Sequence, residues 1–419
     1  KPVEPPIGKE SLYATQFKNL PIGQMEEKFA DYGEVQIKQL NDRSKMYYTP
    51  NKENNVFQLV VQYGAGEREF PKLGYAAQLM NNAGIMGAYE PQELKEELSK
   101  LNATCHVTAD DDNLYIIMEG YEATLPQACQ LLSRQILMPK LDEKQLARLK
   151  GSAMGMRQQR KDNVSILNEA LRQYMLYGEK SDYIKELTDK EIYELQISEL
   201  TGDINRASNY EAKVFFTGTL PFDQVYDILS KNLPLVANER PSNSPQAKDM
   251  MPVTENTVYF LPNNDAEQAQ IHLYIPMQKA DKKDDVLRSA FNQYFGLDFT
   301  GIVLNEIREK RSMAYTAYAF VGTQGIAGKA SYLRGYIGTQ NDKANDALDV
   351  LMGLVNDMPK NPERIDNIKS YLRQAMLTSH PSFRNKAMEL VDLGYRGYTD
   401  DPAKENLPNC LLYTSDAAD

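Results

Sequence analysis

The chain has 419 residues, which is enough for two or more domains that each bury a core of their own. Its hydrophobic content of 42% and charged content of 25% are typical of globular proteins. With 47 Lys and Arg against 58 Asp and Glu, the net charge of -11 argues against a nucleic-acid partner and does not suggest an anionic membrane surface. The longest apolar runs have the length of strands, so the sequence predicts no transmembrane helix.

The first half of the chain is predicted to be a linker followed by a domain. Residues 1–34 hold four prolines in their first 21 positions and show no sustained period, which predicts an extended linker. The domain is assigned to residues 35–237. Alternating apolar residues predict its strands at 35–40, 45–49, 56–63, 102–108, 114–120 and 213–218. Apolar residues at helical spacing predict its helices at 73–82, 92–101, 124–137, 142–160, 165–177, 189–199 and 222–233.

A second domain is predicted after a second linker. Residues 238–253 are rich in Pro, Ser and Asn, which indicates a domain linker. Strands are then predicted at 258–261, 269–275, 314–321 and 329–337, and helices at 285–295, 299–310, 342–356, 362–378 and 381–393. Residues 409–419 continue no earlier pattern and are interpreted as a cloning or sequencing scar. The second domain is therefore assigned to residues 254–408.

The two domains repeat one pattern. The sequence QLVV that begins at Gln58 matches QIHL at Gln270, an offset of 212, and LYG ending at Gly178 matches GYRG ending at Gly397, an offset of 219. An offset this steady indicates an ancient duplication. We therefore expect an α+β fold of two homologous domains, each a mainly antiparallel sheet with helices packed on one face. The second copy is expected to be incomplete at its C-terminal end, without its last strand and helix.

The histidines do not have the spacing of metal ligands. The chain has three, His106, His272 and His380, and no two of them lie within a helical turn or a hairpin of each other. Each is interpreted as structural or solvated. The sequence thus predicts no catalytic zinc in this chain.

The stretch Phe299–Val321 carries the strongest candidate for a binding element. Apolar residues at helical spacing predict a helix with basic residues in its last turn, and the alternating residues after it predict a strand. The helix would deliver Arg308 and the strand Tyr315. Both are hydrogen-bond donors suited to a peptide carbonyl or a developing oxyanion. The alternative is an arginine at a helix C-terminus and a packed tyrosine.

The run from Arg308 to Tyr315 resembles the Arg/Tyr element in the C-terminal half of the insulinase/pitrilysin (M16) metallopeptidase family. Lys310 and Arg311 fit the spacing of that element less well. The resemblance implies the M16/LuxS-like metallohydrolase fold. It also implies two halves that close on a peptide, of which one carries an H-x-x-E-H zinc motif and the other contacts substrate through Arg308 and Tyr315 without a metal.

The resemblance also identifies a degenerate zinc helix at 73–82. Gly74–Gly84 is similar to the family's G-x-A-H-x-x-E-H frame, with Ala77 in place of the first ligand, Met80 in place of the catalytic glutamate and Asn81 in place of the second histidine. The later helix that would carry the last ligand has no carboxylate between residues 145 and 161. No cofactor is therefore expected in this chain, and zinc is expected in an N-terminal half.

The resemblance implies the metal-free C-terminal half of an M16 zinc metalloendopeptidase, inactive by itself. Its partners would be the zinc-bearing half, on the same polypeptide or a separate subunit, and a peptide substrate. Two alternatives remain open: a stand-alone non-catalytic subunit that pairs with a separate zinc-bearing chain, and a purely structural module like the core subunits of respiratory complexes. For the compartment, the family's bacterial members suggest the periplasm or cell envelope.

Overall fold

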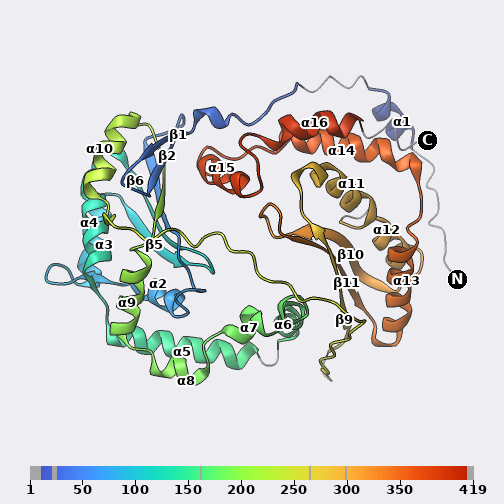
Figure 1. Ribbon diagram of the computed structural model, residues 1–419, viewed down its shortest axis with the longest axis horizontal. Coiled ribbons are helices and arrows are strands. Elements are labelled where there is room, and N and C mark those ends of the chain that lie inside the picture. Colours follow the sequence, from blue (N-terminus) through green and yellow to red (C-terminus); the bar gives the residue numbers. More distant parts are fainter. Residues whose placement is uncertain (1–10, 21–25, 161–162, 264–265, 298–299, 413–419) are drawn as a thin grey trace.

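The computed structural model describes residues 11–20, 26–160, 163–263, 266–297 and 300–412, and it shows an α+β protein with two lobes, each built on one main sheet (Figure 1). No helix in these ranges is long and apolar enough to cross a membrane. The strands of the first lobe are β1 Gln36–Gln39, β2 Lys45–Pro50, β3 Val56–Tyr63, β4 Gly84–Ile85, β5 Thr104–Ala109, β6 Leu114–Tyr121, β7 Pro139–Lys140 and β8 Ala212–Gly218. Its α-helices are α2 Leu73–Met80, α3 Pro91–Lys100, α4 Leu125–Leu137, α5 Glu143–Arg160, α6 Val164–Tyr177, α7 Asp182–Lys185, α8 Asp189–Glu194, α9 Ile197–Ala207 and α10 Phe222–Asn232.

The first sheet has the strand order β1-β2-β8-β3-β6-β5 and is antiparallel except for the pair β2 and β8. Alternation along β3 decides which residues face the helices: Phe57, Leu59 and Val61 are fully buried in the main core. Val60, between them, faces the other side of the sheet. The helices therefore cover one face, as expected.

The second lobe repeats this order of elements on a smaller scale. It consists of β9 Ala269–Lys279, α11 Asp285–Phe295, α12 Ile302–Leu304, β10 Ala314–Thr323, β11 Ala330–Thr339, α13 Ala344–Asn356, α14 Ile365–Thr378, α15 Lys386–Tyr395 and α16 Pro402–Leu412. Its sheet has the order β10-β11-β9, which reproduces the order β5-β6-β3 of the first sheet with the same antiparallel pairing.

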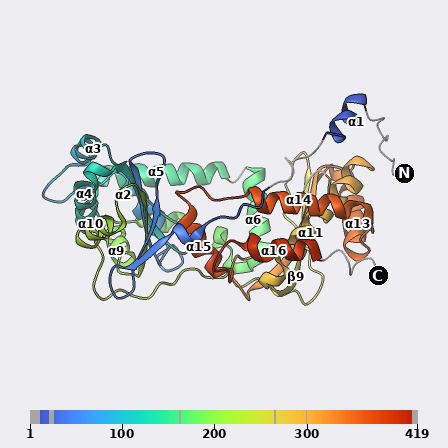
Figure 2. The same ribbon diagram turned by 90° about the horizontal axis from the view of Figure 1, so that it is seen from above.

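Each lobe covers the outer sheet face of the other with one helix. Ala387 on α15 packs with Val60 and Phe215 on the outer face of the first sheet. In return, Asn168 on α6 binds His272 on β9, with 2.8 Å between Asn168 Oδ1 and His272 Nε2. Figures 1 and 2 both show α15 beside the first sheet, far along the chain from the strands it covers. The lobes are thus held together by helices at equivalent positions of the repeat.

The strand predicted at Val258–Leu261 does not form. This segment is irregular, and Val258 and Phe260 are 87% and 83% exposed. The offset of 212 makes it the counterpart of β2, which pairs with β8 and β1 but not with β3. Among the described residues of the second lobe no strand takes the place of β8, so the segment has no neighbour to pair with and β9 keeps a free edge.

We expect Phe260→Ser to change the free energy of unfolding by less than about 0.5 kcal/mol, because its side chain lies in solvent. Tyr48→Ser, at the equivalent position of the first lobe, should cost about 3–5 kcal/mol. Tyr48 is 5% exposed, and its hydroxyl donates to the Leu220 carbonyl at 2.8 Å. Urea unfolding followed by circular dichroism measures both values, and equal losses would show that Phe260 is packed.

Three further expectations were wrong in part. Residues 1–34 are not extended throughout: α1 spans Leu12–Lys18, with the Ser11 hydroxyl accepting from the Ala14 N–H as its N-cap. The helix predicted at 189–199 is two helices, α8 and α9, divided at Leu195. Residues 409–412 do not break the pattern before them, because they continue α16, where Cys410 packs on α11 and α14 and is 3% exposed. The rest of the stretch interpreted as a scar, residues 413–419, lies outside the described residues.

Candidate functional site

The three degenerate zinc positions on α2 lie in a packed interior. Ala77 and Met80 are each 1% exposed and belong to the main core of the first lobe. The Asn81 side chain makes two bonds to the edge strand β5, accepting from the Val107 N–H at 2.7 Å and donating to the Val107 carbonyl at 2.9 Å. Ala77 and Met80 therefore pack in the core, and Asn81 stabilises the contact between α2 and β5.

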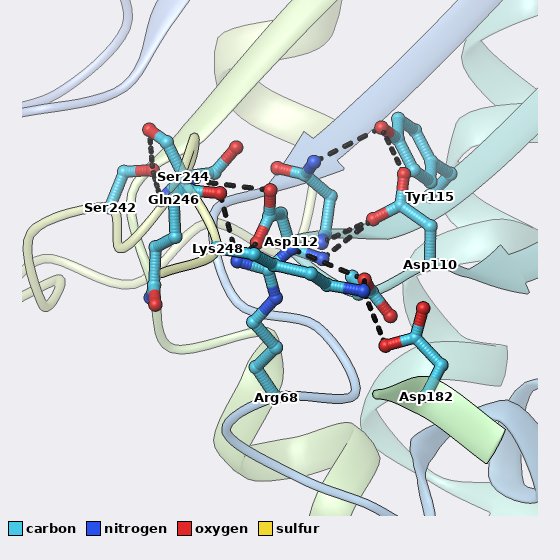
Figure 3. A network of polar contacts seen from close by, with 11 residues as sticks. Arg68, Asp110, Asp112, Tyr115, Asp182, Ser242, Ser244, Gln246 and Lys248 are labelled. Atoms are coloured by element: carbon cyan, nitrogen blue, oxygen red, sulfur yellow. Dashed lines mark hydrogen bonds and ion pairs between the residues drawn. The ribbon is translucent and has the colours of Figure 1, made fainter. Parts of the chain in front are cut away.

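The exposed side of α2 faces a cavity of about 740 Å³. Tyr75 and Gln78 line it from α2, and Ala153 and Arg157 line it from α5. The linker between the lobes forms another wall of this cavity, and this wall is charged. Lys248 of the linker binds Asp111 at 2.8 Å and also binds Asp182 (Figure 3). Arg157 in turn donates to Asp189, with 2.8 Å between Nη1 and Oδ1. Ion pairs thus occupy much of the wall of this cavity.

Glu67 is the most perturbed acid in this cavity. Burial raises its pKa to about 7, and the negative charges of Asp111 and Asp110 act in the same direction. Its carboxylate lies against the first turn of α2, where a side chain at Gly74 would collide with it. A larger share of this acid is therefore protonated at neutral pH than of an exposed glutamate.

This cavity does not fit a catalytic zinc ion. Zinc needs three protein ligands of the His, Cys, Asp or Glu type on one site. In the described ranges no group of three or more such side chains could hold a metal, and the side chains at Ala77, Met80 and Asn81 are not such ligands. His272 is hydrogen-bonded to Asn168 of α6. Burial, together with the charges of Arg334 and Arg172, lowers the pKa of His272 to about 4.

The second candidate element, around Arg308 and Tyr315, has three irregular backbone features in succession. Residues Asn305–Glu309 form a π-helix turn, so the helix predicted at 299–310 is α-helical only at Ile302–Leu304, and Phe299 lies outside the described residues. Ser312 has a positive φ of 51°. In β10, Ala314 pairs with Thr339 and Thr316 with Gly338, so Tyr315 between them is an extra, bulged residue. Such features cost energy and concentrate where side chains must be aimed.

This backbone brings Arg308 and Tyr315 together. The guanidinium carbon of Arg308 lies 5.0 Å from the centroid of the Tyr315 ring, in cation–π range. Tyr315 is 75% exposed, and the Arg308 side chain is 34% exposed. Glu309 lies 3.4 Å from Arg308 Nε as its ion-pair partner. The pair therefore presents a cation and a phenol to solvent from one surface.

Glu306 separates the neighbouring basic residues from this pair. It binds Lys310 at 3.1 Å and also binds Arg311, whose Nη1 donates to the Glu306 carbonyl at 2.7 Å. Burial opposes ionisation, but these two cations outweigh it and lower the pKa of Glu306. Lys310 and Arg311 are thus held on Glu306, while Arg308 stacks on Tyr315. The sequence spacing predicts the pair, but the π-turn and the bulge that aim it have no recognisable sequence signal.

A family model matches part of the chain. Residues 208–372, which include Arg308 and Tyr315, match the family model described as the peptidase M16 inactive domain. No curated protein matches the chain by sequence.

Solved structures resemble the chain over most of its length. It is similar to a peptidase M16 inactive domain from Pseudomonas fluorescens, with a TM-score of 0.67, 18% identity, and coverage of 90% of this chain and 91% of that one. A conserved protein from Enterococcus faecalis gives a TM-score of 0.71 at 15% identity, covering 90% and 93%. The periplasmic protease PqqL from Escherichia coli gives 0.67 at 12% identity, covering 96% of this chain but 47% of that one. At these identities the likeness shows the fold.

Proposed function

We propose, from the match of residues 208–372 to the model of the peptidase M16 inactive domain, that the chain is the non-catalytic half of an M16 zinc metalloendopeptidase. In this role it closes the substrate chamber opposite a half that supplies zinc and the hydrolytic chemistry. The chain has no side chains that could hold the metal at the degenerate positions Ala77, Met80 and Asn81. Its own contribution is therefore to bind and orient the peptide.

The observation that carries this proposal is the geometry of Arg308 and Tyr315. A bulge and a residue with positive φ hold Tyr315 exposed beside a guanidinium 5.0 Å from its ring. Such backbone features concentrate where side chains must be aimed, which favours a binding role over a packed arginine and tyrosine. Both side chains donate hydrogen bonds, so together they can hold a peptide carbonyl and stabilise negative charge that develops on its oxygen.

In the assembled peptidase, Arg308→Ala and Tyr315→Phe are each expected to lower kcat about 10²–10³-fold, since each removes one donor to the developing charge. KM should change less, because the donors act mainly in the transition state. Cleavage of a fluorogenic peptide library by the complete assembly measures both constants. The matched controls are Arg43→Ala and Tyr193→Phe, both at exposed positions away from the pair.

The outcome also separates this role from its alternatives. A purely structural module would keep kcat and KM unchanged in all four variants, which would contradict the proposal. A stand-alone subunit would show the same losses, but its zinc-bearing partner would be a separate polypeptide. Purification of the assembly under denaturing conditions shows whether the zinc-bearing half and this chain are one polypeptide or two separate subunits.

A further inference from the structure

The first lobe has a second concave site, around the start of the edge strand β5, where the end of β6 also contributes to the lining. It is a groove of about 640 Å³, within the roughly 300–1,000 Å³ typical of ligand pockets. Helix α3 forms one wall, and the start of β5 with the end of α2 forms another. The lining is mostly apolar and includes Leu94, Leu98, Ala83 and Ala103, which are all at most 9% exposed. No step of the proposed peptidase role uses this groove.

The edge of β5 offers backbone hydrogen-bonding groups to the groove. Val107 bonds through both its N–H and its carbonyl to the Asn81 side chain, so these groups point away from β6. In an antiparallel pair such outward-facing residues alternate, and Cys105, two residues earlier, must face the same way. Cys105 and Asn81 both line the groove. Among the described strands, β5 pairs with β6 alone, so the outward groups of Cys105 remain available to a ligand.

Asn81 limits how far a ligand strand could extend. Its amide imitates a neighbouring strand at Val107 and occupies the two backbone groups there. A strand added to β5 can therefore pair at Cys105 but not at Val107. Asn102, which lines the groove just before β5, has a positive φ of 49° because it ends α3: its N–H donates to the Ser99 carbonyl and the Ala103 N–H donates to the Leu98 carbonyl.

The charge of the groove selects an anionic group. Glu119 lines it but has Arg384 at 3.7 Å as a cationic partner and accepts from Gln58 at 2.8 Å. Lys95 lines it from α3 and donates to the Asn82 amide oxygen at 2.9 Å. Within the described part of the chain, no carboxylate lies within ion-pair distance of Lys95. A ligand that brings a carboxylate is therefore complementary to the charge of the groove.

We propose that this groove binds an extended peptide, separately from the Arg308 and Tyr315 element. The peptide backbone pairs with Cys105 on the edge of β5, an apolar side chain fills the space against Leu94 and Leu98, and a carboxylate binds Lys95. The apolar side chain supplies affinity and the backbone pairing fixes the direction of the peptide. The carboxylate belongs either to an acidic side chain or to the C-terminus of the peptide.

The test measures binding of short fluorescein-labelled peptides to the purified chain by fluorescence anisotropy. One peptide has a central Leu followed by Glu and an amidated end, a second has a C-terminal Leu with a free carboxylate, and a third has the central Leu without either carboxylate. At least one of the first two should bind ten-fold or more tightly than the third. Failure of all three to bind, or equal binding of all three, would overturn the proposal.

Variants of α3 and hydrogen exchange locate the bound peptide. Ser99→Trp, at an exposed position that lines the groove, should weaken binding at least ten-fold by filling it. Gln92→Trp, exposed on the same helix but outside the lining, should leave binding unchanged. The bound peptide should slow exchange of the Cys105 amide and leave that of Val107 unaltered. Equal affinity of the two Trp variants, or protection elsewhere without Cys105, would place the peptide at another site.

Discussion

Restoring the family's zinc motif on α2 by Ala77→His, Met80→Glu and Asn81→His together is expected to unfold the first lobe instead of creating a metal site. Ala77 and Met80 are each 1% exposed, so the new imidazole has no room and the new carboxylate is buried. Overpacking costs about 1–3 kcal/mol and an unpaired buried charge costs several more. The loss of both Asn81 bonds to Val107 adds about 1–3 kcal/mol for each backbone group left unsatisfied.

The combined loss is comparable to the roughly 5–15 kcal/mol stability of a whole domain. Urea unfolding and measurement of bound zinc by mass spectrometry test it directly. Gln78→His is the matched control, because Gln78 is exposed on the same helix and should change stability by less than about 0.5 kcal/mol. A triple variant that keeps the stability of the parent and binds one zinc per chain would show that these positions are accessible to solvent and metal.

Ala387→Asp is expected to cost about 3–5 kcal/mol and to release α15 from the first sheet. Ala387 is 2% exposed and packs against Val60 and Phe215, where a carboxylate finds no partner in the apolar cluster. Because α15 belongs to the second lobe, its release should loosen the contact between the lobes. Hydrogen exchange of the strands that α15 covers, together with urea unfolding, measures both effects.

Ser382→Asp provides the control for this substitution. It adds the same charge at an exposed position in the loop before α15 and should have little effect. If Ala387→Asp left exchange in β3 and β8 unchanged, the packing of α15 on the first sheet would contribute little to the association of the lobes. If both variants loosened it equally, the effect would come from charge alone.

Most of the secondary structure could be predicted from local pattern. The alternation in β3 and the apolar stripe of α4 identify buried strands and amphipathic helices because each pattern directly reflects which face is buried. The errors occur where a neighbour distant in sequence decides the outcome. Val258–Leu261 has a strand pattern as clear as that of β2, yet it lacks a strand to pair with and stays irregular.

The candidate sites show the same division. The spacing of Arg308 and Tyr315 on a helix and the following strand predicts that the two side chains could meet. In the structure the Arg308 guanidinium carbon lies 5.0 Å from the centroid of the Tyr315 ring. The bulge that exposes Tyr315 depends on the register between β10 and β11, which no local pattern reveals. The groove beside β5 was not predicted, because its walls come from separate segments of the chain, among them α3 and β5. The hydrogen bond from the Asn81 amide to the Val107 carbonyl has no local sequence signal either.

The sequence by itself determined the periods of the helices and strands, the repeat of one pattern in two domains, and the absence of zinc-ligand residue types from α2. These are properties of residue order and type, which folding does not alter. Only the tertiary structure decided that α6 and α15 each cover the sheet of the other lobe, and that Ala77 and Met80 lie in a core. Burial and strand pairing depend on contacts between distant segments, so they are settled only when the whole chain has packed.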